Sequence, residues 1–555
     1  MLNYKRYKKN PVIDYPEREW PNKEITKAPI WCSVDLRDGN QALIDPMIVE
    51  EKVEMFNYLV KLGFKEIEVG FPAASQIEYD FLRQLIERKM IPDDVRVQVL
   101  TQCRKELIER TFESIEGCSQ AIVHIYNSTS TLQRDVVFHM NEDEIVNIAV
   151  EGTKMVKECA KDFPGKIILE YSPESFTGTE LPFALRICTE VQKTWGATKE
   201  NPIIINLPST VEMNTPNVYA DQIEWMNRHF EDRDSIILSV HPHNDRGTGV
   251  ASAELSLLAG ADRVEGTLFG NGERTGNVDV LNIAYNMFSQ GIDPQLNIEH
   301  INEIIEIYER CCKIPIHPRH PYAGKLVFTA FSGSHQDAIR KGYEYMAESD
   351  TPYWEVPYLP INPADLSREY EPVIRINSQS GKGGAAFVLQ HAVGYRLPKE
   401  MHPEFGNIVK AASDAFGDEL KEEQIVDLFN REYVEFDGKY KLASHSFLEQ
   451  RELDGTTHTR FEGKIDVCGD MKEVAGVGNG PIDSFFQALA GIGVEGYEFV
   501  NYHEHAISRG SDAKGICYIE LKIPGNGHIF GVGIDSNINV AALLGILCAI
   551  NRAEK

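Results

Sequence analysis

Two hydrophobic patterns alternate between about residues 28 and 269. Short runs rich in β-branched residues predict strands, and longer stretches with apolar residues three and four positions apart, such as Val53, Phe56 and Leu59, predict amphipathic helices. Three of the predicted helices cover residues 51–62, 79–89 and 142–161. The predicted strands cover residues 30–34, 66–69, 95–101, 121–126, 166–171, 202–207, 235–240 and 263–269.

Eight strands, each followed by a helix, favour a (β/α)8 barrel. A doubly wound open sheet is the competing architecture, and the strand count argues against it. In a barrel the chemistry lies at the carboxyl ends of the strands. Polar groups follow nearly every predicted strand there, although hydrophilic loops alone would supply some of them: Arg37, Asp38, Glu68, Gln102, His124, Ser172, Glu174, Thr210, His241, His243, Glu273 and Asn277.

The residues His241 and His243 end the seventh predicted strand. Successive strand side chains alternate between faces, so these two imidazoles project to the same side. Two imidazoles held side by side in this way suit one half of a divalent metal site. An isolated His-x-His is more often one core and one exposed histidine, so the interpretation depends on further ligands elsewhere in the chain.

The segment 35–41 ends the first predicted strand, and Gly39 allows a sharp turn that presents Arg37 and Asp38. An ordinary surface turn explains the segment equally well. With the two histidines, Asp38 completes a mixed oxygen and nitrogen donor set that suits Mg²⁺, Mn²⁺ or Zn²⁺ acting as a Lewis acid. Arg37 then stands where a developing oxyanion needs a fixed positive charge.

The glycine-rich loop 270–277 follows the eighth predicted strand. It is not a dinucleotide fingerprint, because the third glycine comes one residue too late for G-x-G-x-x-G. We interpret it as a tight loop that delivers the amide oxygen of Asn277 as a fourth ligand, with Glu273 nearby.

The strand–helix alternation stops at about residue 317, and a Pro-rich, charged and largely helical region follows to about residue 432. The remainder contains a weak internal repeat, in which the glycine-rich segments 474–481 and 529–536 each lead into a predicted helix. Glycine turns that open helices present free N–H groups and suit a carboxylate. Two ordinary strand–turn–helix units would explain the repeat as well.

Composition narrows the function classes. Across 555 residues the net charge is −28, which argues against nucleic acid or an anionic membrane surface as a partner. The ten cysteines show no C-x-x-C spacing, the N-terminus leads into no apolar signal segment, and the longest apolar run, 540–550, is too short to span a bilayer. These features predict a cytoplasmic protein with reduced thiols.

Several motifs, taken together, resemble the family of 2-isopropylmalate and homocitrate synthases, and most closely its longer class of 2-isopropylmalate synthases. The resemblance extends almost end to end. It rests on Asp35-Leu-Arg-Asp-Gly-Asn-Gln41, His241-Pro-His-Asn-Asp245, Gly272-Glu-Arg-Thr-Gly-Asn277, Tyr171-Ser-Pro-Glu174, Leu207-Pro-Ser-Thr-Val-Glu212, Phe331-Ser-Gly-Ser-His-Gln-Asp337 and Val356-Pro-Tyr-Leu-Pro360.

The resemblance implies an acyltransferase that condenses acetyl-CoA with 3-methyl-2-oxobutanoate and releases 2-isopropylmalate and CoA, the first committed step of leucine biosynthesis. It implies metal ligands at Asp38, His241, His243 and Asn277, and catalytic roles for Arg37, Glu174, His335 and Tyr358. Whether Glu174 or His335 removes the acetyl proton stays open. The implied substrate-binding residues are Leu100, His124, Tyr126, Ser172, Asn206, Thr210 and Glu273.

The resemblance also implies four regions: an N-terminal extension (1–27), a catalytic barrel (28–325), helical linker subdomains (326–432) and an α+β regulatory domain with a ββα-type repeat (433–555). Mg²⁺ is the expected metal, with K⁺ as an activator. A homodimer with a shared active site and feedback inhibition by leucine are expected as well. The leucine site is expected at Gly476, Gly478, Asn479, Gly531 and Gly533.

Three alternatives stay open. Another 2-oxo acid acceptor would give citramalate or homocitrate. An acceptor with a second carboxylate would need a cationic or polar group to face it, whereas the apolar Leu100 stands at that kind of position. A metal-dependent lyase or aldolase on the same barrel would gain little from the long C-terminal region. A non-catalytic amino-acid sensor would tolerate loss of ligands and proton carriers that this chain retains.

Overall fold

The computed structural model describes residues 6, 10–372, 384–416, 420–435, 438–451, 457–508, 513–523, 525 and 527–555. The chain forms two compact units. The first comprises Met1–Phe328 with Pro360–Glu369, and the second comprises Thr329–Leu359 with Tyr370–Lys555. Within the described residues, no helix combines the length and the apolar character needed to cross a membrane.

The first unit is a closed barrel of eight parallel strands in sequence order, in which β8 pairs with β1. This confirms the barrel and excludes the open sheet. Most strand residues are fully buried, because one face meets the barrel interior and the other meets the helices. The strands are β1 (Ile30–Ser33), β2 (Glu66–Gly70), β3 (Arg96–Gln102), β4 (Gln120–Ser128), β5 (Lys166–Glu174), β6 (Ile203–Ser209), β7 (Ile236–Pro242) and β8 (Arg263–Gly266).

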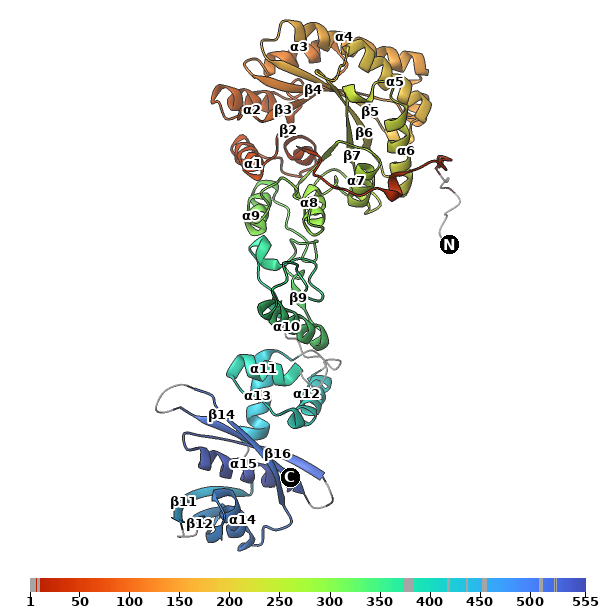
Figure 1. Cartoon of the computed structure of the whole chain (residues 1–555). Helices are drawn as coiled ribbons and strands as arrows, with labels where there is room; N and C mark the ends of the chain where they lie inside the picture. Colours follow the sequence, from red (N-terminus) through yellow and green to blue (C-terminus); the bar gives the residue numbers. More distant parts are fainter. Residues whose placement is uncertain are drawn as a thin grey trace. The chain divides into compact units, whose positions relative to one another are not determined.

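The helices of this unit surround the strands (Figure 1). Their starts follow local sequence signals: at α4, Asn141 accepts a hydrogen bond from the backbone of Glu144, whose carboxylate accepts one in return, a capping box. The helices are α1 (Val49–Leu62), α2 (Gln76–Glu87), α3 (Lys105–Ser114), α4 (Glu142–Lys161), α5 (Leu181–Trp195), α6 (Pro216–His229), α7 (Gly249–Leu258), α8 (Val280–Phe288) and α9 (Ile301–Cys312).

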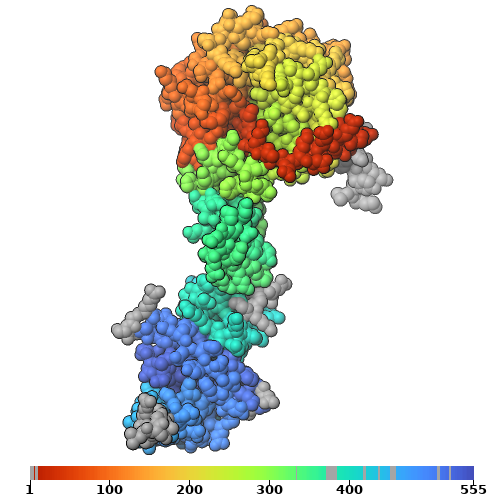
Figure 2. All heavy atoms as spheres, viewed as in Figure 1, coloured from red at the N-terminus to blue at the C-terminus, as the bar shows by residue number. Residues whose placement is uncertain are grey.

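The N-terminal segment lies across the outside of the barrel, where Figure 2 shows it in dark red. Arg18 and Trp20 both donate to the carboxylate of Asp221 on α6, and Lys23 pairs with Glu224 one turn further on. The segment is therefore fixed to the helix layer by buried carboxylates and by Tyr15, whose buried ring lies against Arg228 of α6.

The barrel interior contains a buried ionic network. Arg263 is fully buried and donates to the carboxylates of Glu66 and Glu265 and to the amide oxygen of Gln98. Buried charges persist only where they are paired and hydrogen-bonded. Glu265 connects this network to the carboxyl end of β7, because its Oε2 lies 2.7 Å from Nδ1 of His241.

The second unit begins with a largely helical part. It contains the short paired strands β9 (Thr329–Ala330) and β10 (Glu371–Pro372) and a group of helices, the first of which lies between the two strands in the sequence. These helices are α10 (Gly333–Glu348), α11 (Gly384–Val393), α12 (His402–Phe416) and α13 (Glu422–Phe429).

The C-terminal part of the second unit repeats one arrangement twice, three antiparallel strands followed by a helix. The predicted repeat is present, with three strands rather than two before each helix. The first copy is β11 (Tyr440–Arg451), β12 (Thr457–Val467), β13 (Asp470–Gly478) and α14 (Pro481–Ala490). The second is β14 (Glu498–Ala506), β15 (Gly515–Ile523), β16 (Gly527–Asp535) and α15 (Ile538–Ala553).

Candidate metal and substrate site at the mouth of the barrel

Asp38 lies in a helical turn, Asp35–Gly39, directly after β1. The turn is tied to the barrel because Asp35 accepts a hydrogen bond from the backbone N–H of Leu268, after β8. Burial raises the pKa of Asp35 to about 7, although Ser33 and Leu268 donate to its carboxylate. The turn thus holds Asp38 at the mouth of the barrel with its side chain buried.

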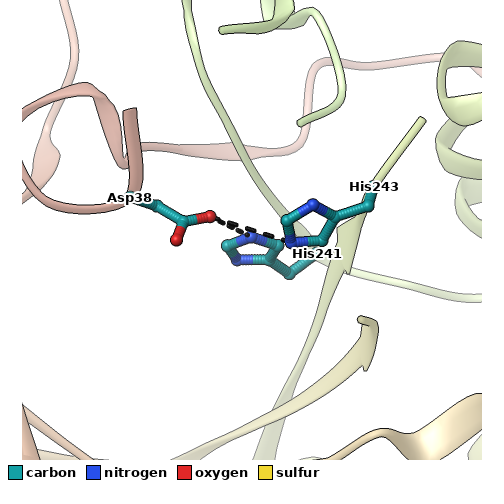
Figure 3. Close-up of side chains that lie close together, drawn as sticks. All are labelled: Asp38, His241 and His243. Atoms are coloured by element: carbon teal, nitrogen blue, oxygen red, sulfur yellow. Dashed lines mark ion pairs between the residues drawn. The ribbon is translucent and has the colours of Figure 1, made fainter. Parts of the chain in front are cut away.

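His241 and His243 project from the end of β7 toward Asp38 (Figure 3). Their rings stack with centroids 5.4 Å apart, and their Nε2 atoms lie 3.3 and 3.8 Å from Oδ2 of Asp38. All three side chains are buried, and one ligand atom from each lies within 4.8 Å of the others. The structure therefore brings together the two imidazoles and the carboxylate that the sequence nominated.

Asn277 supplies a fourth donor to the same point. Its Oδ1 lies 3.0 Å from Nε2 of His241, while its Nδ2 donates to the carbonyl of Asn271, which orients the amide oxygen toward the histidine. The loop passes so close to this amide that a Cβ on Gly272 would lie 2.4 Å from Nδ2 of Asn277. Gly272 is therefore required for steric reasons, since any larger residue at this position would displace the amide of Asn277.

The cluster combines one ionised carboxylate with two imidazoles that differ in pKa. Although burial opposes its ionisation, Arg37 and His241 hold the pKa of Asp38 far below its ordinary value. Burial also opposes a charged His241, but hydrogen bonds to Asp38 and Glu265 raise its pKa to about 10. Burial and the charge of His241 lower the pKa of His243 to about 4. Oδ2 of Asp38 is buried and makes no hydrogen bond of good geometry to the described residues, although Nε2 of His241 lies 3.3 Å away. Carboxylate, imidazole and amide donors that converge in this way fit a divalent metal ion.

Glu265 orients His241 and was not selected from the sequence. It lies on β8, fully buried, and its Oε2 lies 2.7 Å from Nδ1 of His241. In the neutral imidazole that binds a metal, this contact places the ring hydrogen on Nδ1 and leaves Nε2 free for the cluster. A signal existed, because Arg263 and Glu265 put two charges on one face of a predicted strand.

Arg37 is the positive group of the site. It donates to Glu68 at 2.5 Å and to Asp38 at 2.6 Å. Glu68 lies 3.0 Å from Nδ1 of His124, whose Nε2 lies 2.8 Å from the hydroxyl of Ser172. Arg37 and the pocket residues on β4 and β5 are therefore fixed by one buried carboxylate.

A cavity of about 220 Å³ opens beside the cluster at the carboxyl ends of the strands. Hydrogen bonds orient two of its lining groups: Ser128 donates to a carboxylate oxygen of Glu174, and Thr210 accepts from the backbone N–H of Ser175. Sequence reasoning missed three lining residues, Gln41, Pro208 and Arg274. The nominated residues that line the cavity are Arg37, Asp38, Leu100, His124, Tyr126, Ser172, Glu174, Asn206, Thr210, His241, His243 and Glu273.

The remaining two catalytic candidates, His335 and Tyr358, belong to the second compact unit. Their rings stack with centroids 4.1 Å apart, His335 near the start of α10 and Tyr358 in the segment after it. Tyr358 is 62% exposed and has a φ of +65°, an uncommon backbone conformation for a bulky residue. The structure pairs these two side chains with each other, and their contribution to the barrel site stays a prediction.

The glycines predicted to bind leucine lie where strands press against helices. A Cβ on Gly476 would lie 2.2 Å from the carbonyl of Ser484 on α14, and a Cβ on Gly533 would lie 2.0 Å from the carbonyl of Ala541 on α15. Gly478 and Gly531 are equally close to the same helices. Packing therefore accounts for the glycine pattern, and contact with leucine stays a prediction.

Three ranges of the chain match protein-family models. Residues 28–307 match the family described as HMGL-like, residues 325–390 match the alpha-isopropylmalate synthase, post-catalytic domain-like family, and residues 419–554 match the LeuA allosteric (dimerisation) domain.

Curated relatives match over nearly the full chain. The 2-isopropylmalate synthase of Clostridium acetobutylicum is 54% identical, with 99% of both chains covered. That of Rhodospirillum rubrum is 52% identical, covering 99% of this chain and 98% of its own, and that of Rhizobium johnstonii is 53% identical, covering 99% and 97%. Among solved structures, an HMG-CoA lyase from Bacillus subtilis aligns with 52% of this chain and 95% of its own at 19% identity and a TM-score of 0.41.

Proposed function

The chain belongs to the family of 2-isopropylmalate synthases, and from that premise we propose how its residues carry out the reaction. The reaction is a Claisen condensation: acetyl-CoA loses a methyl proton, the carbon attacks the ketone of 3-methyl-2-oxobutanoate, and hydrolysis of the thioester gives 2-isopropylmalate and CoA. It is the first committed step of leucine biosynthesis. Asp38, His241 and His243 converge beside the cavity, and this observation supports the assignment of the reaction to particular residues.

We propose Asp38, His241, His243 and Asn277 as the ligands of a divalent metal ion. When bound, the metal would chelate the 2-oxo acid and polarise its ketone. Mg²⁺ is our first choice, and Mn²⁺ and Zn²⁺ also suit this mixed donor set. Activation by K⁺ is a further proposal that rests on the family resemblance alone.

Arg37 stabilises the negative charge that develops on the ketone oxygen. Its guanidinium is fixed before substrate arrives, because Glu68 and Asp38 hold two of its nitrogens. A preoriented charge in a buried site needs no reorganisation during the reaction, and it therefore contributes more than the same charge in water.

Glu174 is the barrel residue placed to move the acetyl proton. Ser128 donates to one of its carboxylate oxygens, and the residue lines the cavity. His335 is the other candidate base, and Tyr358, its stacking partner, is proposed to protonate the alkoxide that becomes the new hydroxyl. Positioned acid–base groups each contribute about 10²–10⁴-fold.

The 2-oxo acid lies in the pocket formed by Leu100, His124, Tyr126, Ser172, Asn206 and Thr210, with Glu273 at its edge. The oxygen of Thr210 accepts from Ser175, so its hydroxyl hydrogen is left to donate to the substrate carboxylate. Leu100 offers an apolar surface to the isopropyl group. The same surface disfavours an acceptor that carries a second carboxylate.

We further propose a homodimer with a shared active site, leucine binding at Gly476, Gly478, Asn479, Gly531 and Gly533, and a cytoplasmic location. The match of residues 419–554 to an allosteric dimerisation domain supports the dimer and the regulation. We also propose that the chain divides into four regions, 1–27, 28–325, 326–432 and 433–555. The three ranges that match family models support this division.

The test is CoA release from acetyl-CoA, followed by thiol titration, with 3-methyl-2-oxobutanoate, pyruvate and 2-oxoglutarate as acceptors. Each reaction is run with Mg²⁺ or EDTA, and with or without leucine. We expect metal-dependent turnover that prefers 3-methyl-2-oxobutanoate and is inhibited by leucine. Preference for another acceptor would refute the substrate assignment, and turnover insensitive to leucine would refute the regulatory one.

The variants Glu174→Gln and His335→Gln separate the two candidate bases. Exchange of the acetyl methyl protons in deuterated buffer, measured with an unreactive acceptor analogue, reports proton removal alone. The variant that abolishes exchange identifies the base. Retention of exchange in both variants would refute both assignments.

A further inference from the structure

Arg274 joins two loops at the mouth of the barrel. Its Nε donates to Oδ1 of Asp245 at 2.7 Å, and its Nη2 donates to the carbonyl of Thr210 at 2.6 Å and to Oδ2 of Asp245 at 3.2 Å. The side chain is 40% exposed and lines the cavity. One guanidinium therefore connects the loops that follow β6, β7 and β8.

On one side, Arg274 is linked through its loop to the proposed metal ligands. It lies three residues before Asn277, in a loop closed by hydrogen bonds from Gly276 to Glu273 and from Asn244 to Gly276. Its partner Asp245 comes two residues after His243. Displacement of the guanidinium would therefore move the segments that carry two of the proposed ligands.

On the other side, Arg274 reaches the segment of the proposed base. The carbonyl that it holds belongs to Thr210, whose hydroxyl accepts the backbone N–H of Ser175, the residue after Glu174. Ser175 has a φ of +61°, so this hydrogen bond holds a backbone conformation that serine rarely adopts. The path from Arg274 to Glu174 thus contains one side chain and two hydrogen bonds.

The surroundings fix this arrangement. Oδ2 of Asp245 also accepts the backbone N–H of Glu212, whose carboxylate in turn accepts from Arg246 and Thr248. Arg274 itself has a φ of +58°. A non-glycine residue persists in that conformation where several contacts over-determine it, and such sites cluster at functional loops.

We propose that Arg274 is a positioning residue that sets the distance between the metal-bound 2-oxo acid and the carboxylate of Glu174. The inference rests on the proposed function. The condensation needs the acetyl methyl group to lie between these two, and a misplacement of about 1 Å costs on the order of a hundredfold in rate. Since Nε and Nη2 are engaged by protein groups, Arg274 acts through the loops rather than by binding substrate.

The experiment compares Arg274→Ala, Arg274→Lys and Asp245→Asn in the full-length protein with Mg²⁺. We expect Arg274→Ala to lower kcat by about tenfold to a hundredfold while KM for 3-methyl-2-oxobutanoate stays within about threefold. Arg274→Lys keeps one of the two contacts and falls in between, as does Asp245→Asn. Millimolar guanidinium should restore part of the activity of Arg274→Ala.

The matched control is Arg233→Ala. Arg233 also bridges an aspartate, Asp262, and a backbone carbonyl, that of Gly260, but it does so at the amino ends of β7 and β8. Its loss should lower the melting temperature without changing kcat or responding to guanidinium. If Arg274→Ala, like the control, lowered the melting temperature and left kcat unchanged, the proposal would be overturned.

Two other results would also overturn it. A rise in KM for the 2-oxo acid with kcat unchanged would show that Arg274 binds substrate through its remaining nitrogen. A loss of Mn²⁺ affinity in parallel with kcat, measured by electron paramagnetic resonance, would show that it acts only on the metal loop. Inactive wild-type protein would instead refute the proposed function itself.

Discussion

Replacement of Glu265 by Gln should weaken metal binding, although it changes only one atom. Four N–H donors surround the carboxylate of Glu265, and the buried carboxyl of Glu170 lies beside it. Oε2 of Glu265 lies 2.7 Å from Nδ1 of His241 and 3.2 Å from Nδ2 of Asn206, and its Oε1 lies 2.6 Å from Nη1 of Arg263 and 3.1 Å from Nε2 of Gln98. Whichever way the amide of the variant turns, its NH₂ group meets two donors.

The magnitude follows from this count of contacts. A hydrogen bond to a charged group contributes about 1.5–3 kcal/mol, so two lost bonds cost about 3–6 kcal/mol of folding free energy. If the amide nitrogen faces His241, the imidazole loses the group that places its hydrogen on Nδ1. Removal of such an outer-shell partner typically weakens metal affinity by about 10–100-fold, or about 1.4–2.7 kcal/mol.

The assay is titration with Mn²⁺, followed by electron paramagnetic resonance or calorimetry, together with kcat at saturating metal. Glu66→Gln is the matched control. Glu66 is equally buried and also binds Arg263, but it makes no contact with His241 in the described structure. The control should lose stability and keep its metal affinity. Wild-type Mn²⁺ affinity in Glu265→Gln would refute the reasoning.

Three other perturbations test separate parts of the structure. Burial opposes a charged His320, but its hydrogen bond to Asp279 raises its pKa. The pair therefore stabilises the fold below about pH 6.5, and this contribution is lost as pH rises through the folded-state pKa. His320→Gln should lower the melting temperature more at pH 6 than at pH 9, and an equal loss at both pH values would contradict this. Leu100→Ala should lower kcat/KM for 3-methyl-2-oxobutanoate relative to pyruvate by about tenfold or more, and an unchanged ratio would remove Leu100 from the pocket. Gly533→Ala should destabilise the C-terminal domain, because the new Cβ would lie 2.0 Å from the carbonyl of Ala541; calorimetry that shows an unshifted C-terminal transition would show that the strand and helix can separate without cost.

The sequence by itself determined the barrel and the position of its chemistry. Hydrophobic periodicity is a local property, so the eight strands and helix α4 lie within a few residues of where the pattern placed them. Side-chain alternation put His241 and His243 on one side, and the barrel rule put Asp38 and Asn277 at the same end. These positions need no knowledge of which distant segments touch.

The tertiary structure alone decided which groups support that chemistry. Glu265 meets His241, and Arg274 joins Asp245 to Thr210, because strands and loops that are 24 to 64 residues apart become neighbours when the barrel closes. From the sequence, the glycines of the C-terminal repeat predict a binding site for a carboxylate, yet close packing against α14 and α15 also explains them. Local patterns record propensity and periodicity, whereas the partners of a buried charge and the clearance at a glycine depend on long-range closure of the fold.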